Sequence, residues 1–181
     1  MPPIEIVTTR LRLVPITPEL VRAFFNDRDK LSRLLKASIP NDWPVDPVIM
    51  EILIKRLDDP SAFEWADYIC IHKEDGKVVG DGGFKGPPDT DGCVEIGYGI
   101  IPEYRKRGLA TEAALALVEL AFSHQEVKIL CAETVIDGIA SIRVLQKLGM
   151  HQHGTNHNDE DGDLYCWQLT RDDYEDNVRH H

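Results

Sequence analysis

The sequence is poor in long apolar runs and in basic residues. No apolar run approaches the length needed to cross a bilayer, and the N-terminus lacks the charged-then-apolar pattern of a secretory signal. The 20 lysines and arginines stand against 31 acidic residues, so the formal net charge is −11. Since duplex binding depends on neutralising phosphates, this charge argues against a nucleic-acid partner. We expect a cytoplasmic protein with neither a membrane nor a nucleic-acid partner.

Cysteine is also scarce, and its placement argues against two common kinds of stabilisation, a zinc site and a disulfide framework. The four cysteines are far apart in the chain, at Cys70, Cys93, Cys131 and Cys166, and they fall inside predicted strands. Such spacing matches neither a zinc-binding pattern nor a compact disulfide framework. We therefore predict buried, reduced thiols.

Metal-binding and nucleotide-binding motifs are missing as well. Three histidines lie within 151–157, but a polar loop there fixes no coordination geometry. A calcium loop aligned on Gly162 would begin at His157 and end at Gln168, where acidic ligands are required. The glycine-containing segments fit neither a dinucleotide fingerprint nor a P-loop. We predict that the protein holds no metal.

The composition that remains is that of an ordinary globular protein. Of the 181 residues, 43% are hydrophobic and 28% are charged, and a chain of this length can bury one substantial core. No internal repeat or linker divides it. We predict one domain over residues 1–175 and a disordered tail over 176–181.

Apolar periodicity predicts a mixture of strands and helices. Strands are expected at 4–14, 68–72, 77–84, 93–101, 128–135 and 164–169. Helices are expected at 18–35 with an interruption near Asn26 and Asp27, and at 49–57, 109–122 and 139–148. The polar stretch 151–163 is expected to be a loop. Because a helix crosses between strands 93–101 and 128–135, these two should be parallel, in an α/β fold whose sheet is otherwise mostly antiparallel.

Residues 93–111 combine a strand, a basic loop and a buried helix. Pro102 should end the strand, because it has no backbone N–H to donate. The helix that begins near Leu109 is apolar on nearly every side, so we expect it to pack against the sheet. Three cations and Gly108 precede this helix, where the first N–H groups have no internal partner. The arrangement predicts an anion site suited to a pyrophosphate.

The same stretch resembles a known family. The sequence RKRGLA at 105–110 is similar to the acyl-CoA-binding signature Q/R-x-x-G-x-G/A of the GCN5-related N-acetyltransferases, the GNAT superfamily. Segments that resemble the branch with the ribosomal-protein alanine acetyltransferases are 95–98, 102–104, 108–113 and 140–150. The resemblance extends from Thr9 to Trp167.

This resemblance implies a fold in which helices flank the sheet and strands 93–101 and 128–135 splay apart to admit acetyl-CoA. It implies acetyl transfer to a primary amine by direct attack, with no covalent enzyme intermediate and no metal. A bulge in strand 93–101 would aim the N–H of about Ile100 at the acetyl carbonyl. The residues implied to hold the coenzyme are Gly99, Ile100, Ile101, Arg105, Lys106, Arg107, Gly108, Leu109, Ala110, Thr111 and Ser141.

Two residues are candidates for proton transfer. Glu95 interrupts an apolar strand on the face that Gly97 and Gly99 leave open, where strand propensity disfavours a carboxylate. The resemblance implies a general base there, and a solvated glutamate is the alternative. Ser141 is implied to protonate the leaving thiolate, with a hydrogen bond at the helix entry as the alternative. Gly138 stands where the family usually has asparagine, which leaves open a CoA-binding regulatory or degenerate relative without turnover.

The acceptor is expected to be an amine of one of two classes, a protein N-terminus or a small molecule. Trp43 either forms an aromatic wall of the acceptor site or packs under its proline-rich loop, and Glu133 either contacts the acceptor or packs. Removing a proton at pH 7 costs about 4.6 kcal/mol for a lysine-like amine and about 1 kcal/mol for an α-amine, which favours the α-amine. A homodimer is left open.

Overall fold

The elements of the protein are given by a computed structural model that describes residues 4–44, 48–55, 57–59, 63–65, 67–159 and 161–179. The strands are β1 (Ile6–Val7), β2 (Leu11–Pro15), β3 (Asp67–His72), β4 (Lys77–Phe84), β5 (Cys93–Ile100), β6 (Ile129–Val135), β7 (His151–Asn158) and β8 (Gly162–Thr170). The helices are α1 (Pro18–Asn26), α2 (Arg28–Leu35), α3 (Val48–Ile54), α4 (Leu109–Ser123), α5 (Ile139–Lys147) and α6 (Arg171–Arg179), with a 3-10 turn, η2 (Pro102–Tyr104).

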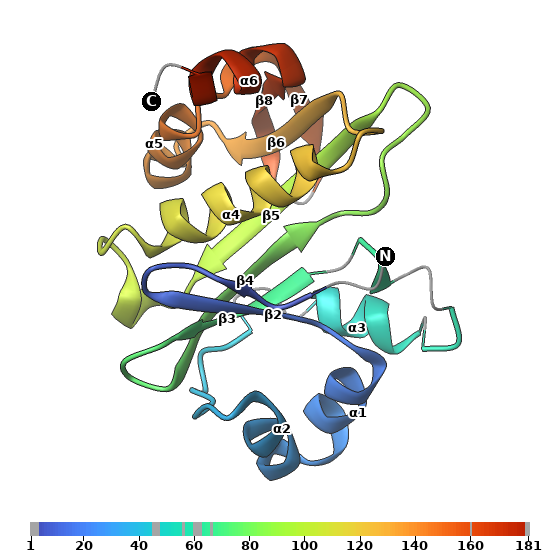
Figure 1. Ribbon diagram of the computed structural model, residues 1–181, viewed down its shortest axis with the longest axis vertical. Helices are drawn as coiled ribbons and strands as arrows, with labels where there is room; N and C mark the ends of the chain where they lie inside the picture. Colours follow the sequence, from blue (N-terminus) through green and yellow to red (C-terminus); the bar gives the residue numbers. More distant parts are fainter. Residues whose placement is uncertain are drawn as a thin grey trace.

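The strands form one mixed sheet in the order β1-β2-β3-β4-β5-β6-β8-β7 (Figure 1). Every neighbouring pair is antiparallel except β5 and β6, which are parallel because α4 crosses between them. The predicted α/β class is confirmed, as are its mostly antiparallel sheet and its parallel pair.

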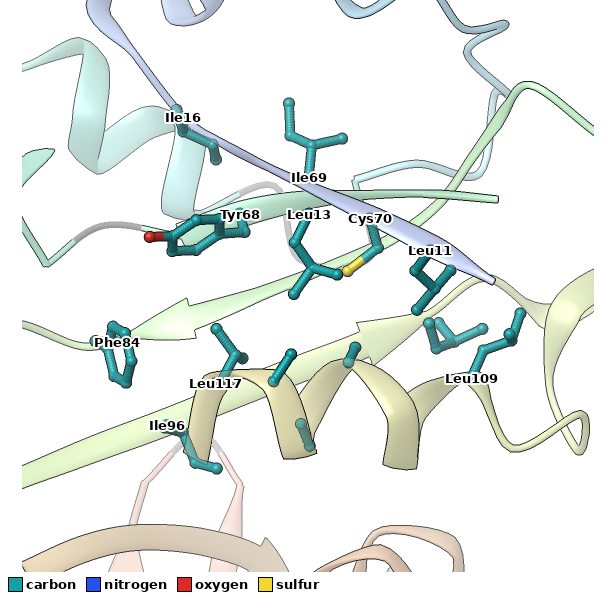
Figure 2. Packing of buried hydrophobic residues seen from close by; sticks show 14 of the residues in the cluster. Leu11, Leu13, Ile16, Tyr68, Ile69, Cys70, Phe84, Ile96, Leu109 and Leu117 are labelled. Carbon is teal, nitrogen blue, oxygen red and sulfur yellow. The ribbon is translucent and has the colours of Figure 1, made fainter. Parts of the chain in front are cut away.

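Helix α4 packs on the sheet, as its apolar surface predicts. Leu109 and Leu117 of α4 are at most 1% exposed, and Leu11 and Leu13 of β2 point toward the helix (Figure 2). Ile69 of β3 points to the opposite side of the sheet, where α1 and α3 lie (Figures 1 and 2). Burying a leucine contributes about 1.5–3 kcal/mol, so this layer is a major source of stability.

The expected interruption of the first helical segment has a local cause. Pro18 starts α1, and the Thr17 hydroxyl accepts a hydrogen bond from the N–H of Leu20 at 3.3 Å. Asp27 ends α1 and caps α2, because its carboxylate accepts a hydrogen bond from the N–H of Lys30 at 2.8 Å. One aspartate therefore separates the two helices.

Two segments differ from expectation. The stretch 151–163 contains strand β7 and its hairpin turn into β8, and it is not a loop. Strand β7 lies at the edge of the sheet and its side chains are exposed or half-buried, so no apolar alternation marks it in the sequence. The opening strand 4–14 is divided into β1 and β2 by a turn in which Thr8 N–H donates to Leu11 O at 3.0 Å.

Helix α6 extends through part of the segment 176–181 that the sequence predicts to be a tail. The Thr170 hydroxyl accepts a hydrogen bond from Asp173 N–H at 3.2 Å and so caps the helix. Arg171 donates to the Val127 carbonyl, and Tyr174 stacks on Phe122 with ring centroids 4.6 Å apart. Residues 180–181 lie outside the described residues. Among the helices of the described part of the chain, none has the length and apolar character needed to cross a membrane.

Candidate active site

Strand β5 pairs with β4 along one edge from Ile96 to Ile100, and its other edge is paired only at its start. Its parallel pairing with β6 comprises Cys93 with Ile129, Val94 with Leu130, and Glu95 with Cys131. Beyond that last pair, β6 continues along β8 to Val135 and no longer pairs with β5. The two strands therefore separate at Glu95, as the predicted splayed pair requires.

The backbone of the second half of β5 faces this gap. Lys85 N–H donates to the Glu95 carbonyl, and Ile101 N–H donates to the Val79 carbonyl, so the odd-numbered residues bond toward β4. Backbone groups alternate along a strand, so the N–H groups of Tyr98 and Ile100 point toward the gap. An extended ligand could therefore pair with β5 there, as an added strand does.

The expected bulge in β5 is not present in its pairing with β4. The register runs without a shift from Phe84 opposite Ile96 to Gly80 opposite Ile100. The two backbones approach closely here, since a Cβ on Gly80 would collide with the Gly99 carbonyl oxygen. The gap-facing direction of the Ile100 N–H thus follows from ordinary strand alternation.

The basic loop 105–108 joins η2 to α4 and is exposed. Lys106 (φ 60°) and Gly108 (φ 78°) both have left-handed backbone conformations, and α4 begins directly after them at Leu109. Arg105 Nε donates to the Ile100 carbonyl at 2.9 Å, which anchors the loop to the end of β5. Arg107 stacks 4.6 Å over the Tyr104 ring. The loop thus presents cations and a helix N-terminus together, and this combination attracts anions.

A cavity of about 400 Å³ lies beside the point where β5 and β6 separate. Its lining residues come from the β4–β5 loop and from β5, β6, β7 and β8: Lys85, Gly86, Pro87, Asp89, Cys93, Glu95, Cys131, Ala132, Glu133, His153, Cys166 and Trp167. Three carboxylates face it and Lys85 is its one lysine, so a cationic ligand is electrostatically favoured.

The structure brings Glu95 and Glu133 together in this cavity. The Lys85 ammonium lies against Glu95 Oε1, and the Glu95 side chain is 29% exposed. Glu133 Oε1 accepts a hydrogen bond from Asn156 Nδ2 at 2.9 Å. Both carboxylates therefore have a partner on one oxygen while they border the same open space.

Trp43 and Ser141 do not line the cavity. Trp43 is 2% exposed and packs edge-on against Phe24, with ring centroids 5.8 Å apart, so the packing interpretation describes its surroundings. Ser141 is half-buried in the first turn of α5, and its carbonyl accepts a hydrogen bond from the Tyr98 hydroxyl at 3.4 Å. Gly138 occupies the N-cap position of α5, and no side chain caps this helix. The functional roles given to Trp43 and Ser141 stay predictions.

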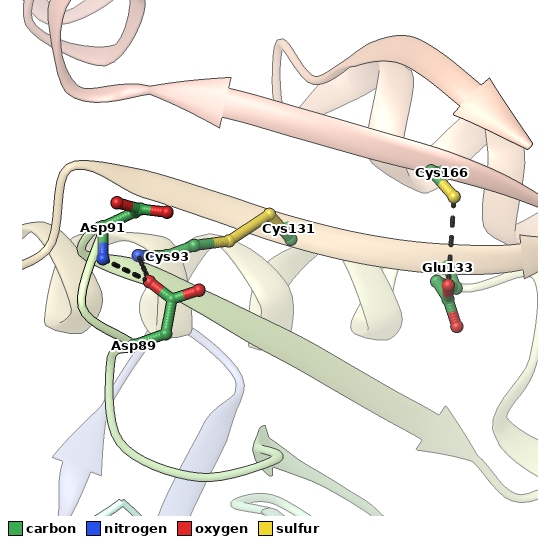
Figure 3. The surroundings of a disulfide bond; sticks show 6 residues. All are labelled: Asp89, Asp91, Cys93, Cys131, Glu133 and Cys166. Carbon is green, nitrogen blue, oxygen red and sulfur yellow. Dashed lines mark hydrogen bonds between the residues drawn. A yellow bond between two sulfur atoms is a disulfide. The ribbon is translucent and has the colours of Figure 1, made fainter. Parts of the chain in front are cut away.

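The prediction of four reduced thiols is wrong for two of them. Cys93 and Cys131 form a disulfide between β5 and β6, with Cα atoms 6.6 Å apart (Figure 3). Glu95 pairs with Cys131, and Cys93 precedes Glu95 by two residues, so both cysteines lie on the same face of adjacent strands. Their separation of 38 residues hides this neighbourhood from the sequence. Cys166 is free and lies 3.8 Å from Glu133 Oε1 (Figure 3).

Sequence reasoning missed Lys85 and Tyr98. Lys85 follows a predicted strand, and the hairpin register that places Phe84 opposite Ile96 also brings it to Glu95. The two strand patterns do not fix this register, so the sequence alone carries no signal for the contact. Tyr98 lies on the face of β5 opposite Glu95, and burial raises the pKa of its phenol well above the usual value. In the described part of the chain, no group of three or more His, Cys, Asp or Glu residues is arranged to hold a metal.

Fold and site together define an acyltransferase architecture, and comparisons with known proteins assign the family. The sequence-family model of the acetyltransferase (GNAT) domain matches residues 10–151 of this chain. The N-acetyltransferase YjdG of Bacillus subtilis (strain 168), itself uncharacterized, is 31% identical over 148 residues, which cover 78% of this chain and 86% of that protein. The chain therefore belongs to the GNAT acetyltransferase family, and the predicted family and enzyme class are confirmed.

Solved structures share the fold at low sequence identity. RimL, a ribosomal L7/L12 α-N-protein acetyltransferase solved with coenzyme A, has a TM-score of 0.67 and 15% identity, with 93% of this chain and 98% of that chain covered. The microcin C7 self-immunity acetyltransferase MccE, solved with acetyl-CoA and AMP, has a TM-score of 0.65 and 13% identity, with 90% and 93% covered. The ribosomal-protein-S5-alanine acetyltransferase of Vibrio fischeri also shares this fold, at 16% identity.

Proposed function

We propose that the protein transfers an acetyl group from acetyl-CoA to a primary amine. The observation that carries this proposal is the gap beside β5, which has the basic loop 105–108 at one end and the acidic cavity at the other. Six residues of strand separate Ile101 from Glu95, a distance of about 20 Å. An extended thioester arm anchored at the loop therefore runs along the gap and delivers its acetyl end toward the cavity.

The coenzyme would be held at two places. Loop 105–108 and the first N–H groups of α4 bind the pyrophosphate, because three cations and a helix N-terminus converge there. The gap-facing backbone of Tyr98 and Ile100 binds the pantetheine arm. Bound there, the coenzyme supplies an activated acetyl thioester.

The cavity residues would handle the amine. Glu95 accepts a proton from the acceptor ammonium, directly or through water, and the free amine nitrogen attacks the acetyl carbon. As the carbon–sulfur bond breaks, the nitrogen gives up its second proton to water, and the leaving thiolate takes a proton from a donor that water then reprotonates. Ser141, at the start of α5 and in contact with Tyr98, is the proposed donor on the thiol side. General acid–base groups of this kind contribute about 10²–10⁴ in rate.

The acceptor carries positive charge and offers a primary amine. Asp89, Glu95 and Glu133 outnumber Lys85 around a cavity of about 400 Å³, a volume suited to a small amine or the first residues of a peptide. RimL acts on a protein α-amine by its name, and MccE is an immunity enzyme solved with a nucleotide. We favour an α-amine, because it loses its proton at pH 7 for about 1 kcal/mol against about 4.6 for a lysine-like amine.

Calorimetric titration of CoA and acetyl-CoA tests the coenzyme half first. Wild type and Gly108→Glu are compared at two salt concentrations, and Gly162→Glu is the matched control. Gly162 has φ 75°, close to the 78° of Gly108, and a Cβ there meets no atom within 4 Å. We expect micromolar, salt-sensitive binding by wild type and the control, and none by Gly108→Glu. Failure of wild type to bind either ligand would overturn the proposal.

Thiol release then tests transfer. Three kinds of acceptor are compared. The first is a short peptide with a free α-amine, the second is an N-acetylated peptide whose one amine is a lysine side chain, and the third is a diamine. We expect turnover with the free α-amine to exceed the others. Coenzyme binding without release of thiol by any amine would instead support the regulatory or degenerate relative.

A further inference from the structure

Arg10, in the turn between β1 and β2, is bonded to the start of α4. Its Nε donates to Glu112 Oε2 at 2.7 Å, and its Nη1 donates to the Arg107 carbonyl at 2.8 Å. Its Nη2 lies 3.5 Å from the position that a Cβ on Gly108 would take. One guanidinium from the N-terminal hairpin therefore contacts the loop and the first turn of the helix.

Glu112 completes this connection. Its Oε1 accepts hydrogen bonds from the Thr8 hydroxyl and from the backbone N–H of Arg10, each at 2.6 Å. Its side chain is only 15% exposed, so the carboxylate is held in place by the β1–β2 turn on both oxygens. We refer to Thr8, Arg10 and Glu112 as the hairpin clamp.

The clamp has two consequences for an anion at loop 105–108. The Arg107 carbonyl accepts a hydrogen bond from Arg10, which fixes the peptide unit between Arg107 and Gly108. Because a trans peptide unit points its C=O and N–H in opposite directions, the Gly108 N–H points away from Arg10. The negative charge of Glu112 lies one helical turn from the helix N-terminus and would oppose a pyrophosphate. The ion pair with Arg10 offsets the negative charge of the Glu112 carboxylate.

We propose that Arg10 is a positioning residue for coenzyme binding: through Arg107 and Glu112 it holds loop 105–108 in its anion-binding conformation. This inference rests on the proposed function, since it concerns the same coenzyme. It assigns to the β1–β2 turn a role in binding that the acyl-CoA signature itself does not contain.

The chain offers a matched control for Arg10. Arg12, two residues further along, pairs with Glu5 through the same Nε–carboxylate contact of 2.7 Å. Its side chain donates to the Leu35 carbonyl and, within the described part of the chain, forms no hydrogen bond or ion pair with loop 105–108. Arg10→Gln and Arg12→Gln therefore each remove one arginine–glutamate pair, and only the first touches the loop.

Two measurements are made on the full chain of wild type, Arg10→Gln, Arg10→Lys and Arg12→Gln. Calorimetry gives the CoA affinity, and hydrogen–deuterium exchange of the free protein reports the amides of 105–111. We expect Arg10→Gln to weaken CoA binding about tenfold or more and to speed exchange in that segment. Arg12→Gln should leave both within about twofold, and Arg10→Lys should recover part of the loss, because lysine restores the charge but only one of the two bonds.

The outcomes separate this inference from the proposed function. If wild type binds no CoA, the proposed function fails. If wild type binds CoA and Arg10→Gln binds it equally well, or if Arg12→Gln loses as much, the positioning role is overturned. Faster exchange over the whole chain of Arg10→Gln, with no excess at 105–111, would show a general loss of stability and would also overturn it.

Discussion

The two halves of the site are built in different ways. The proposed coenzyme half is loop 105–108 with the start of α4, and its residues are consecutive in the sequence. Its shape is set by the backbone, because Lys106 and Gly108 have left-handed conformations and α4 follows directly. The proposed acceptor half is the cavity, which is lined by side chains from four strands and a loop. No two of its carboxylates are neighbours in the sequence. Local sequence can therefore specify the first half, whereas the second exists only after the strands have paired.

The two halves also differ in charge. Loop 105–108 carries three cations, while the cavity has three carboxylates and one lysine. The whole chain has a net charge of −11. The cavity has the same sign of charge as the whole chain, whereas the loop has the opposite sign. Under the proposed function, an anionic coenzyme and a cationic acceptor would each be drawn to their own end of the gap, and screening within about 8 Å at physiological salt keeps the two fields separate. Changes in one half should leave ligand binding by the other half intact.

Among the variants, Glu95→Gln is expected to show the largest difference between its effect on the transfer rate and its effect on CoA affinity. The amide cannot take the proton of the acceptor, so the rate of transfer should fall by about 10²–10⁴. The CoA affinity should stay within about twofold, because Glu95 lies at the far end of the gap. Thiol release and calorimetry provide the two numbers. As a control, Glu119→Gln makes the same change on an exposed position of α4. An equal loss of CoA affinity in Glu95→Gln would show that the two halves are not separate.

Cys93→Ser tests whether the disulfide supports the acceptor half. The bond closes a loop of 38 residues, and its loss should reduce the free energy of unfolding by about 2–4 kcal/mol. Urea denaturation measures the change, and a dithiol reductant should lower the stability of wild type to that of the variant. Cys166→Ser replaces a free cysteine in the same cavity and keeps the disulfide, so the reductant should lower its stability as much as it lowers that of wild type. If the reductant left the free energy of unfolding of wild type unchanged, the Cys93–Cys131 pairing would be contradicted.

The difference between the halves explains what the sequence could and could not predict. The loop, the start of α4 and the separation of α1 from α2 follow from Gly108, Pro102 and Asp27, each of which acts on its own neighbours. The Cys93–Cys131 bond depends on the parallel register of two strands separated by a helix. Edge strand β7 has no buried face, so it leaves no apolar signal.

Long-range contacts to the loop were equally hidden. Arg10 and Glu112 are 102 residues apart, and each alone looks like an ordinary surface charge. The resemblance to a family predicted the coenzyme signature and Glu95, but it did not predict the β4–β5 register or the hairpin clamp. Contacts that depend on register or on the order of the strands need the assembled sheet.

Tyr104→Phe should weaken the support beneath the coenzyme half. The Tyr104 hydroxyl donates to Asp75 at 2.6 Å, and the ring lies under Arg107. Loss of a hydrogen bond to a partly exposed carboxylate should cost about 1.5 kcal/mol, measured by urea denaturation at pH 7. The ring itself is kept, so Arg107 should keep its stacking contact and CoA affinity should fall by less than in Arg10→Gln.

The same variant has a pH signature. Burial, with the Asp75 hydrogen bond second, raises the pKa of Tyr104 to about 12 from the usual 10. Because the unfolded phenol ionises first, this contribution to stability is complete below pH 10 and is lost as the pH rises from 10 to 12. The stability of Tyr104→Phe should therefore fall less steeply than that of wild type over this interval. Parallel curves would show that Tyr104 is not the residue that titrates.

An effect on stability of about the same size is expected from Gly108→Ala, compared with Gly162→Ala. Both glycines have φ between 75° and 78°, so a Cβ should cost roughly 1–2 kcal/mol at either position. Thermal unfolding should then report similar losses for the two variants. Only Gly108→Ala should also weaken CoA binding, by roughly five- to tenfold, because its backbone belongs to the anion site. Equal CoA affinities in the two variants would mean that the cations of the loop, and not its backbone shape, determine binding.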